Sequence, residues 1–380
     1  MKLLTFADFH LGVRTYGKLD HKTGLNTREV DTLRVLDEMI DYAINNNIDV
    51  IIAAGDMYKN NLPSPTLQNE FNKRIIRAAK SNIITLILDG NHDVGRVETS
   101  KSALATFQTL EVDNVFSTKC HDEKIYEIKG KKIKFVFLPT YHTRDEIENI
   151  VNNTNTKEVP TIFIGHLTAI GALLNDWLVE KNETYIDINI FNKPGILAVI
   201  LGHLHKHQIL NYNPLIYYPG STQRVDFNEE NQPKGFVVLD IDDNNNVEYE
   251  FVEVDSQKFC TIKIDLSNIS IDNYTDYIID EINNNIDKID NAITRIQIEM
   301  DDSMSFNDKK IYSRLTELNA STILPIQKQY NNERRIRNAN LTEHITMEKG
   351  LELYYKDKSR AKERIKLGKQ IIDKLNESTS

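Results

Sequence analysis

Five short polar motifs, each placed directly after an apolar run, constrain the fold of this chain more than any other feature of its sequence. In chain order they are Asp8-Phe9-His10, Gly55-Asp56, Gly90-Asn91-His92-Asp93, Gly165-His166 and Gly202-His203-Leu204-His205. The apolar runs before the first three, at residues 2–7, 49–54 and 83–88, are typical of buried strands. Helices predicted over 28–46 and 65–80 separate these runs. The chain should therefore open with a βαβαβ unit whose sheet is parallel.

The apolar pattern predicts further strands up to about residue 253. They lie at 124–129, 132–138, 161–165, 196–201, 208–218 and 235–253, with Gly130-Lys131 as a hairpin turn and the later strands antiparallel. Two packed sheets with flanking helices would accommodate all of them. We therefore expect an α/β fold, a two-sheet βαβ sandwich, in which the polar motifs gather at the carboxyl ends of strands.

The composition changes after about Asp255, which predicts a division into three parts. Strands at 259–264, 292–299 and 322–328 alternate with helices at 273–288 and 307–318, as in a second, smaller βαβαβ unit. From about residue 340 the chain is strongly charged and helical in pattern. We expect a main domain over 1–255, a small α/β cap domain over 256–335 and C-terminal helices over 336–380.

Length and composition describe an ordinary globular chain. With 380 residues, 40% of them hydrophobic and 27% charged, the chain can bury a full core. The sequence has no apolar run long enough for a membrane span and no recognisable signal peptide, so we expect a cytoplasmic protein. Cys120 and Cys260 are far apart and outside every motif, which indicates two reduced thiols. The net charge of −10 argues mildly against a chain that coats nucleic acid by bulk attraction, without excluding DNA as a substrate.

The motifs supply the ligands of a two-metal site. The candidate ligands are Asp8, His10, Asp56, Asn91, His166, His203 and His205. Imidazole, carboxylate and amide groups without a thiolate suit a pair of borderline or hard divalent ions. Two such ions held close together hydrolyse phosphate esters. They would add a charge of +4 to a pocket that contributes −2 from its carboxylates, which leaves the pocket positive toward a phosphate.

Each motif alone has a simpler interpretation. Gly-Asp after a strand is commonly a turn, a lone histidine such as His166 is more often structural, and His92 could cap a helix. His203 and His205 alternate in an extended segment, so their side chains diverge unless the backbone turns near Gly202. The metal interpretation therefore depends on the whole set in its order. His92, next to Asn91, is the best candidate for a proton donor or a phosphate-orienting group.

The order of the motifs resembles that of the calcineurin-like metallophosphoesterase superfamily. Within it, Asp8-Phe9-His10-Leu11-Gly12, the run Tyr218-Pro219-Gly220-Ser221-Thr222-Gln223-Arg224-Val225-Asp226-Phe227 and Lys234-Gly235-Phe236 resemble SbcD-like DNA nuclease subunits. The resemblance covers about residues 1–255. The asparagine-rich, compact form is similar to subunits encoded by bacteriophages or low-GC bacteria. A phage-encoded protein would act in the cytoplasm of its host.

This resemblance implies roles for the motif residues. Asp8, His10 and His205 would bind a first ion, Asn91, His166 and His203 a second, and Asp56 would bridge them. The ions would be manganese, a hydroxide held between them would attack the phosphodiester, and His92 would be the catalytic histidine. One departure is Met57-Tyr58-Lys59 after Gly55-Asp56, where the family often has a histidine.

The resemblance also implies a substrate and partners. It implies a 3′-to-5′ exonuclease on double-stranded DNA and an endonuclease on single strands or hairpins, acting in repair, recombination or replication. The C-terminal helices would dock on an SbcC-like SMC-type ATPase, and the chain would dimerise, with Leu67, Phe71 and Ile75 as candidate contacts. Arg224, Arg334 and Arg335 are candidate substrate contacts.

Several alternatives stay open at this stage. The chain could be a phosphoesterase for small esters or cyclic nucleotides, or a non-catalytic assembly protein. The cap could be a lid without DNA contacts, the basic residues could be solvated surface, and the C-terminal helices could pack on the chain's own body.

Overall fold

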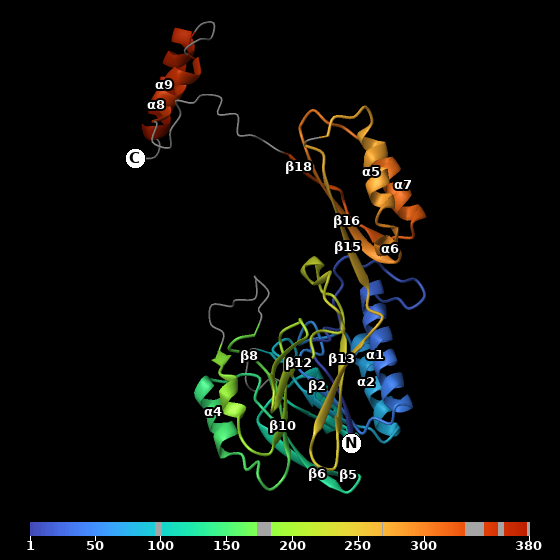
Figure 1. Ribbon diagram of the computed structural model, residues 1–380. Helices are drawn as coiled ribbons and strands as arrows, with labels where there is room; N and C mark the ends of the chain where they lie inside the picture. The colour runs from blue at the N-terminus through green and yellow to red at the C-terminus, as the bar shows by residue number, and fades with distance from the viewer. Residues whose placement is uncertain (96–100, 173–183, 268, 331–345, 356–360, 378–380) are drawn as a thin grey trace.

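Two six-stranded sheets pack face to face and form the body of the molecule (Figure 1). The computed structural model describes the chain except for residues 96–100, 173–183, 268, 331–345, 356–360 and 378–380. In the first sheet the order is β14-β13-β1-β2-β3-β4, and β1 to β4 are parallel. The bounds are β1 (Lys2–Phe6), β2 (Val50–Ala54), β3 (Ile84–Leu88), β4 (Val115–Thr118), β13 (Gly235–Ile241) and β14 (Val247–Glu253).

The second sheet has the order β11-β12-β10-β7-β6-β5. Its strands are β5 (Asp122–Ile128), β6 (Lys131–Phe137), β7 (Thr161–His166), β10 (Ile196–Gly202), β11 (Gln208–Tyr212) and β12 (Leu215–Tyr218). The later strands pair antiparallel, as expected, in β11–β12 and β13–β14. The centre of the second sheet differs, because β6, β7, β10 and β12 run parallel. The connections cross back over the sheet, so the carboxyl ends of β7 and β10 meet at one edge.

Helices cover the outer faces of both sheets. On the first sheet lie α1 (Thr27–Asn45) and α2 (Pro65–Lys80), and on the second lies α4 (Arg144–Asn153). The helix α2 begins as its sequence predicts, because Ser64 accepts a hydrogen bond from Leu67 N and Pro65 occupies the first turn. The remaining short elements are η1 (Ala103–Ala105), α3 (Thr106–Thr109), β8 (Thr168–Ala169), β9 (Tyr185–Ile186), η2 (Ile188–Phe191) and η3 (Phe227–Glu229).

The apolar face of α2 is part of the chain's own core. Leu67, Phe71 and Ile75 are only 3%, 0% and 1% exposed, and they pack into the cluster under α1 and α2. These side chains cannot also contact a second copy of the chain. Their proposed place in a dimer interface is therefore wrong, because an amphipathic pattern does not say which surface the helix covers.

A smaller unit, here called the cap unit, follows the body. It consists of β15 (Lys258–Asp265), α5 (Tyr274–Asn283), α6 (Ile286–Ile289), β16 (Ala292–Met300), α7 (Asp308–Glu317), β17 (Thr322–Ile323) and β18 (Gln327–Tyr330). All of its strand pairs are parallel, and it has a hydrophobic core of its own. The single strand expected over 322–328 is two short ones, since Pro325 lies between them and has no N–H to donate.

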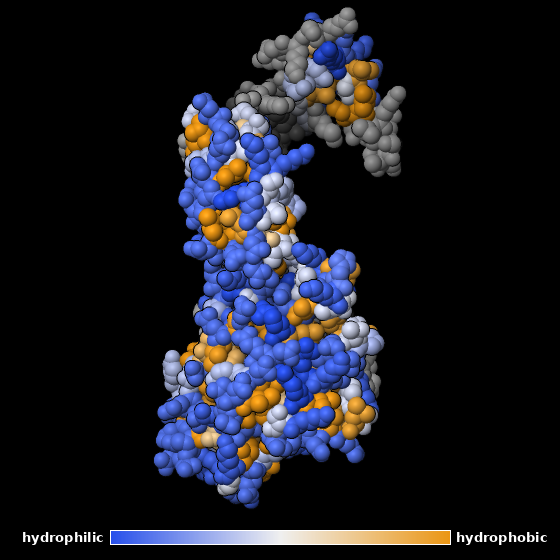
Figure 2. Space-filling model, turned by 90° about the vertical axis from the view of Figure 1, so that its right-hand side faces the viewer, coloured by the Kyte–Doolittle hydropathy of each residue, from blue (hydrophilic) through white to orange (hydrophobic). Residues whose placement is uncertain are grey.

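The last elements are α8 (Met347–Tyr355) and α9 (Ala361–Glu377), which pack on each other. Gly368 allows the close approach, because a Cβ there would lie 2.5 Å from Leu351 Cδ2, and Lys369 Nζ lies 2.7 Å from Glu352 Oε1. Tyr354, Leu367 and Ile371 remain 52–60% exposed, and hydrophobic residues gather on this pair in Figure 2. Within the described residues, none of the helices is both long and apolar enough to cross a bilayer.

Candidate metal centre

The five motifs meet where β1, β2, β3, β7 and β10 end. Asp8 N donates to Gly55 O at 3.0 Å and His10 N to Asp56 O at 2.9 Å, so the first two motifs run side by side. Gly202 at the end of β10 pairs with His166 at the end of β7. Each sheet therefore contributes ligands at the edge where the two sheets adjoin.

The backbone at the centre is unusual for non-glycine residues. Asp8, His10, Asp56 and His203 have φ angles of 51°, 48°, 58° and 98°. Such left-handed conformations cluster at functional sites, where the surrounding structure must enforce them. The backbone turns at His203, so the side chains of His203 and His205 do not diverge as they would in a straight extended segment. Gly202 is required beside it, since a Cβ there would lie 1.8 Å from Ala54 O.

One group of ligand atoms comes from Asp8, His10 and His205. All three ligand atoms lie within 4.8 Å of one another, and His10 Nε2 is 2.9 Å from His205 Nε2. The carboxylate of Asp8 accepts hydrogen bonds from His203 N at 3.0 and 3.1 Å, which fixes its orientation. These are the residues that the resemblance assigns to the first ion.

A second group surrounds His166. Its Nε2 atom lies 3.0 Å from Asn91 Oδ1 and 3.4 Å from Asp56 Oδ2, and the His203 ring centre is 5.3 Å from its own. The same Asp56 oxygen is 3.7 Å from His10 Nε2. Asp56 therefore lies between the two groups, as a bridging carboxylate would.

These spacings fit bound divalent ions. Metal–ligand bonds of about 2.1 Å place neighbouring ligand atoms on one ion roughly 2.9–3.4 Å apart, from octahedral to tetrahedral angles. The separations of 2.9, 3.0 and 3.4 Å in the two groups agree with that value. Nδ1 of His10 is buried and has no hydrogen-bond partner in the described part of the chain. The donor set and its spacing thus suit a pair of divalent cations.

Burial and mutual charge shift the proton affinities of these groups. Burial raises the pKa of Asp8, although neighbouring histidines oppose the shift. Burial acts in the same direction on Asp56, but His166, by charge and hydrogen bond, and His10 hold the pKa of Asp56 well below its usual range. Burial opposes a charge on His166, yet Asp56 raises the pKa of His166 to about 9. These shifts favour an ionised Asp56 beside a protonated His166, and a cation that binds His166 would displace that proton.

His92 lies beside this cluster with its ring held in one orientation. Its Nδ1 is 3.0 Å from Lys59 O, and because a carbonyl can only accept, Nδ1 carries the proton. Its Nε2 faces the cluster, 4.0 Å from Asp56 Oδ2. Its backbone N–H donates to Asp56 Oδ1 at 2.8 Å, which leaves Oδ2 directed to the imidazoles. With 37% of the side chain exposed, His92 can reach a substrate.

Sequence reasoning missed two buried carboxylates near the centre. Asp93 accepts hydrogen bonds from Met57 N, Tyr58 N and Gly90 N at 2.7–3.0 Å and so ties the loop that carries Asp56 to β3. Its place at the end of the third motif could have suggested this role. Glu229 accepts from His205 Nδ1 at 2.7 Å. Nothing in its local sequence marks it.

The predicted substrate contacts have different outcomes. Arg224 donates to Glu230 O, Gln232 O and Ser256 Oγ at 2.7–3.1 Å. The side chain therefore joins the body to the start of the cap unit, and we assign it a structural role. Arg334 and Arg335 lie outside the described residues.

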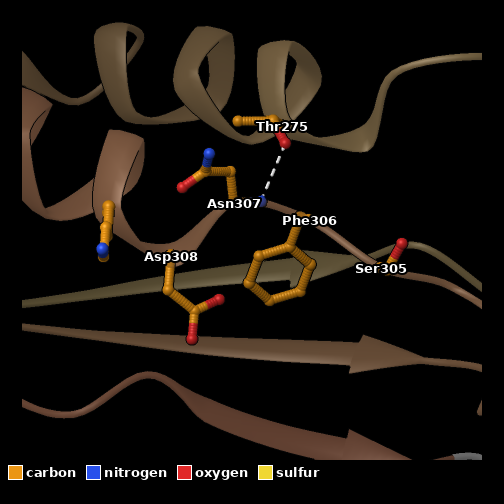
Figure 3. A pocket seen from close by; sticks show the side chains of 6 residues that line it. Thr275, Ser305, Phe306, Asn307 and Asp308 are labelled. Atoms are coloured by element: carbon orange, nitrogen blue, oxygen red, sulfur yellow. Dashed lines mark hydrogen bonds between the residues drawn. The ribbon is translucent and has the colours of Figure 1, made fainter.

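Two hollows differ in their relation to the metal centre. One, of about 450 Å³, is lined in part by Lys59, Asn91, His92 and Tyr141 and so opens beside the cluster. The other, of about 600 Å³, lies at the start of α7 in the cap unit (Figure 3). In it Asn307 N donates to Thr275 Oγ1 at 3.0 Å. Only the first of these two hollows is lined by candidate site residues, Asn91 and His92.

Comparisons with known proteins show which proteins this chain resembles. A family model described as calcineurin-like phosphoesterase matches residues 1–207. A DNA double-strand break repair protein Mre11 of Archaeoglobus fulgidus is 22% identical over 292 residues, covering 70% of this chain and 62% of that protein. An uncharacterized metallophosphoesterase, YhaO of Bacillus subtilis, is 27% identical over 257 residues, covering 65% and 60%. The SbcD component of the nuclease SbcCD of Escherichia coli is 23% identical over 305 residues, covering 71% and 72%. The chain thus spans about three-fifths of the length of the first two relatives.

Proposed function

This chain belongs to the calcineurin-like phosphoesterase family, and from that membership we propose that it is a metal-dependent DNA nuclease. The observation that carries the proposal is the cluster of carboxylate, amide and imidazole ligands around Asp56, with His92 at its side. The names of two relatives, a double-strand break repair protein and a nuclease component, favour DNA over other phosphate esters.

We propose that the centre holds two divalent ions, with manganese as the expected metal. Asp8, His10 and His205 would hold the first ion, and Asp56 would bridge both. The second ion would be held by Asn91, His166 and His203. Bound divalent ions lower the pKa of a water molecule and neutralise charge on phosphoryl oxygens.

His92 would serve as the proton donor. A proton at Nδ1, fixed by Lys59 O, leaves Nε2 to carry a second proton toward the oxygen that leaves the phosphorus. Donation from Nε2 stabilises the charge that develops on that oxygen, which is worth about 10²–10⁴ in rate. The hollow beside His92 would hold the nucleotide end, with the exposed ring of Tyr141 and the Lys59 side chain on its wall.

The cap unit and the C-terminal helices suggest the rest of the function. We propose that the cap unit contacts the DNA backbone and that α8 and α9 dock on an SbcC-like SMC-type ATPase. The exposed side chains of Leu367 and Ile371 support such docking, because apolar groups of this size are costly to leave in water. Exonuclease action on duplex ends and endonuclease action on single strands belong to the same proposal.

A second candidate is a phosphoesterase for small esters. The family description, calcineurin-like phosphoesterase, includes it, because that description covers phosphate esters in general. The metal centre would be the same. The substrate alone separates the two functions.

A nuclease assay tests the proposal. End-labelled linear duplex DNA would be incubated with the full chain and manganese, beside the D56A and H92A variants. We expect mononucleotides to be released by the wild type and by neither variant. Turnover of bis(p-nitrophenyl) phosphate without DNA cleavage, with or without an added SMC-type ATPase, would instead establish the small-ester function.

A further inference from the structure

The imidazole of His205 is held by a side chain, unlike two of its neighbours. His166 Nδ1 lies 3.0 Å from Ala54 O and His92 Nδ1 lies 3.0 Å from Lys59 O, so backbone carbonyls orient those rings. His205 Nδ1 lies 2.7 Å from Glu229 Oε1. A carboxylate is a stronger acceptor than a carbonyl, and it makes the opposite nitrogen a better metal ligand.

Glu229 is itself held by Lys234. The two side chains are fully buried, with 2.7 Å between Lys234 Nζ and Glu229 Oε2. Lys234 Nζ also donates to Ser221 Oγ at 2.7 Å and to His205 O at 3.2 Å. The pair therefore holds His205 twice, at its ring through the carboxylate and at its backbone through the ammonium. A buried carboxylate this close to an ammonium stays ionised and fixed in place.

The segment that carries Glu229 is also anchored to the cap unit. The ring of Phe227 packs on Phe259 of β15 with 4.8 Å between centroids, and Glu230 accepts from Thr261 N at 2.7 Å. Neighbouring side chains on both sides of Glu229 thus bind the cap unit while Glu229 itself turns into the body. This arrangement fixes the carboxylate independently of His205.

We propose that Glu229, kept ionised by Lys234, is a positioning residue that directs His205 Nε2 to the metal ion. Glu229 holds the proton on Nδ1 of His205, so that the lone pair is on Nε2, 2.9 Å from His10 Nε2. This inference rests on the proposed function, because it takes His205 as a metal ligand. It also gives a role to Lys234 of the Lys234-Gly235-Phe236 motif, while Glu229 lies in the segment between that motif and the run that ends at Phe227.

Manganese titration of the metal-free full chain tests the proposal. The variants are Glu229→Gln and its matched control Glu230→Gln, which is adjacent and contacts the cap unit instead of His205. We expect Glu229→Gln to weaken one of two manganese binding events about 10- to 100-fold and to leave the other within about twofold. Glu230→Gln should leave both events unchanged. A general loosening of the fold would weaken both events in both variants.

The outcomes separate the inference from the proposed function. If the wild type binds two ions and a folded Glu229→Gln protein binds them equally well, the inference is wrong. If the wild type takes up no manganese, the proposed function itself is wrong. Glu229→Gln could fail to fold because Lys234 loses its counter-charge. In that case the double variant Glu229→Gln/Lys234→Met removes the unpaired ammonium. The double variant should again weaken one of the two manganese binding events and leave the other unchanged.

Discussion

Replacing Asp56 by asparagine should remove most of the thermal stability that manganese gives to this protein. Asn keeps the shape of the side chain and can still accept the hydrogen bond that His92 N makes to Oδ1. It replaces the anionic Oδ2 that lies 3.4 Å from His166 Nε2 and 3.7 Å from His10 Nε2. If Asp56 bridges the ions, one substitution weakens both binding sites.

The expected size follows from mass action. At 100 times the dissociation constant, each ion stabilises the wild type by about 2.7 kcal/mol, so two ions give about 5 kcal/mol. For a body of this size, about 1 kcal/mol shifts the melting temperature by roughly 2–4 °C, so manganese should raise it by about 10–20 °C. If Asp56→Asn weakens the binding of each ion 100-fold, the two ions together stabilise the variant by less than about 1 kcal/mol. Manganese should then raise its melting temperature by roughly 3 °C or less.

The assay is thermal unfolding followed by circular dichroism, with chelator and then with manganese. Asp89→Asn is the matched control, because Asp89 is equally buried at the end of β3 but belongs to neither ligand group. Asp89→Asn should keep the full manganese-dependent shift. An Asp56→Asn protein that gains as many degrees from manganese as the wild type would refute the bridging role.

Three further predictions follow from individual side chains. His92→Ala should reduce phosphodiester turnover at least about 100-fold while the manganese-dependent melting shift stays, if His92 donates a proton and binds no ion as we propose. Loss of the melting shift would instead make His92 a metal ligand, which its place beside His10 and Asp56 would allow. Burial lowers the pKa of His142, so its contribution to folding is present above pH 6.5 and is lost as pH falls through its folded-state pKa. Urea unfolding of the metal-free protein at pH 7.5 and 5.5 should therefore show a smaller loss of stability for His142→Gln than for the wild type. Phe71→Ala should cost about 3–5 kcal/mol in urea unfolding, since the Phe71 ring is fully buried. If the Phe71→Ala protein instead changes its oligomeric state without losing stability to urea, Phe71 belongs to a dimer interface and not to the core.

Local sequence patterns predicted the parts of the fold that depend on local chemistry. The apolar runs before Asp8, Asp56 and Gly90 are strands β1, β2 and β3, and the Ser64-Pro65 pair begins α2. The spacing of apolar residues and the capping residues at helix ends each involve only a few neighbouring residues, so they can be recognised in a single sequence. The ends of those strands then indicated where the candidate ligands would gather.

Relations between distant segments were not predictable in this way. The parallel pairing of β7 with β10 depends on how the chain crosses the sheet, and the strand pattern is the same for either direction. The burial of Phe71 depends on which surface α2 covers. Glu229 lies 24 residues from His205, and only the folded chain brings their side chains together. The left-handed backbone at Asp8 and Asp56 is likewise imposed by tertiary structure.

The most direct test of the two-metal centre is anomalous X-ray scattering from crystals of the full chain grown with manganese. We predict two manganese peaks about 3.5–4 Å apart, with Asp56 between them. One peak should contact Asp8, His10 and His205, and the other Asn91, His166 and His203. A single peak, or manganese bound away from Asp56, would contradict the account.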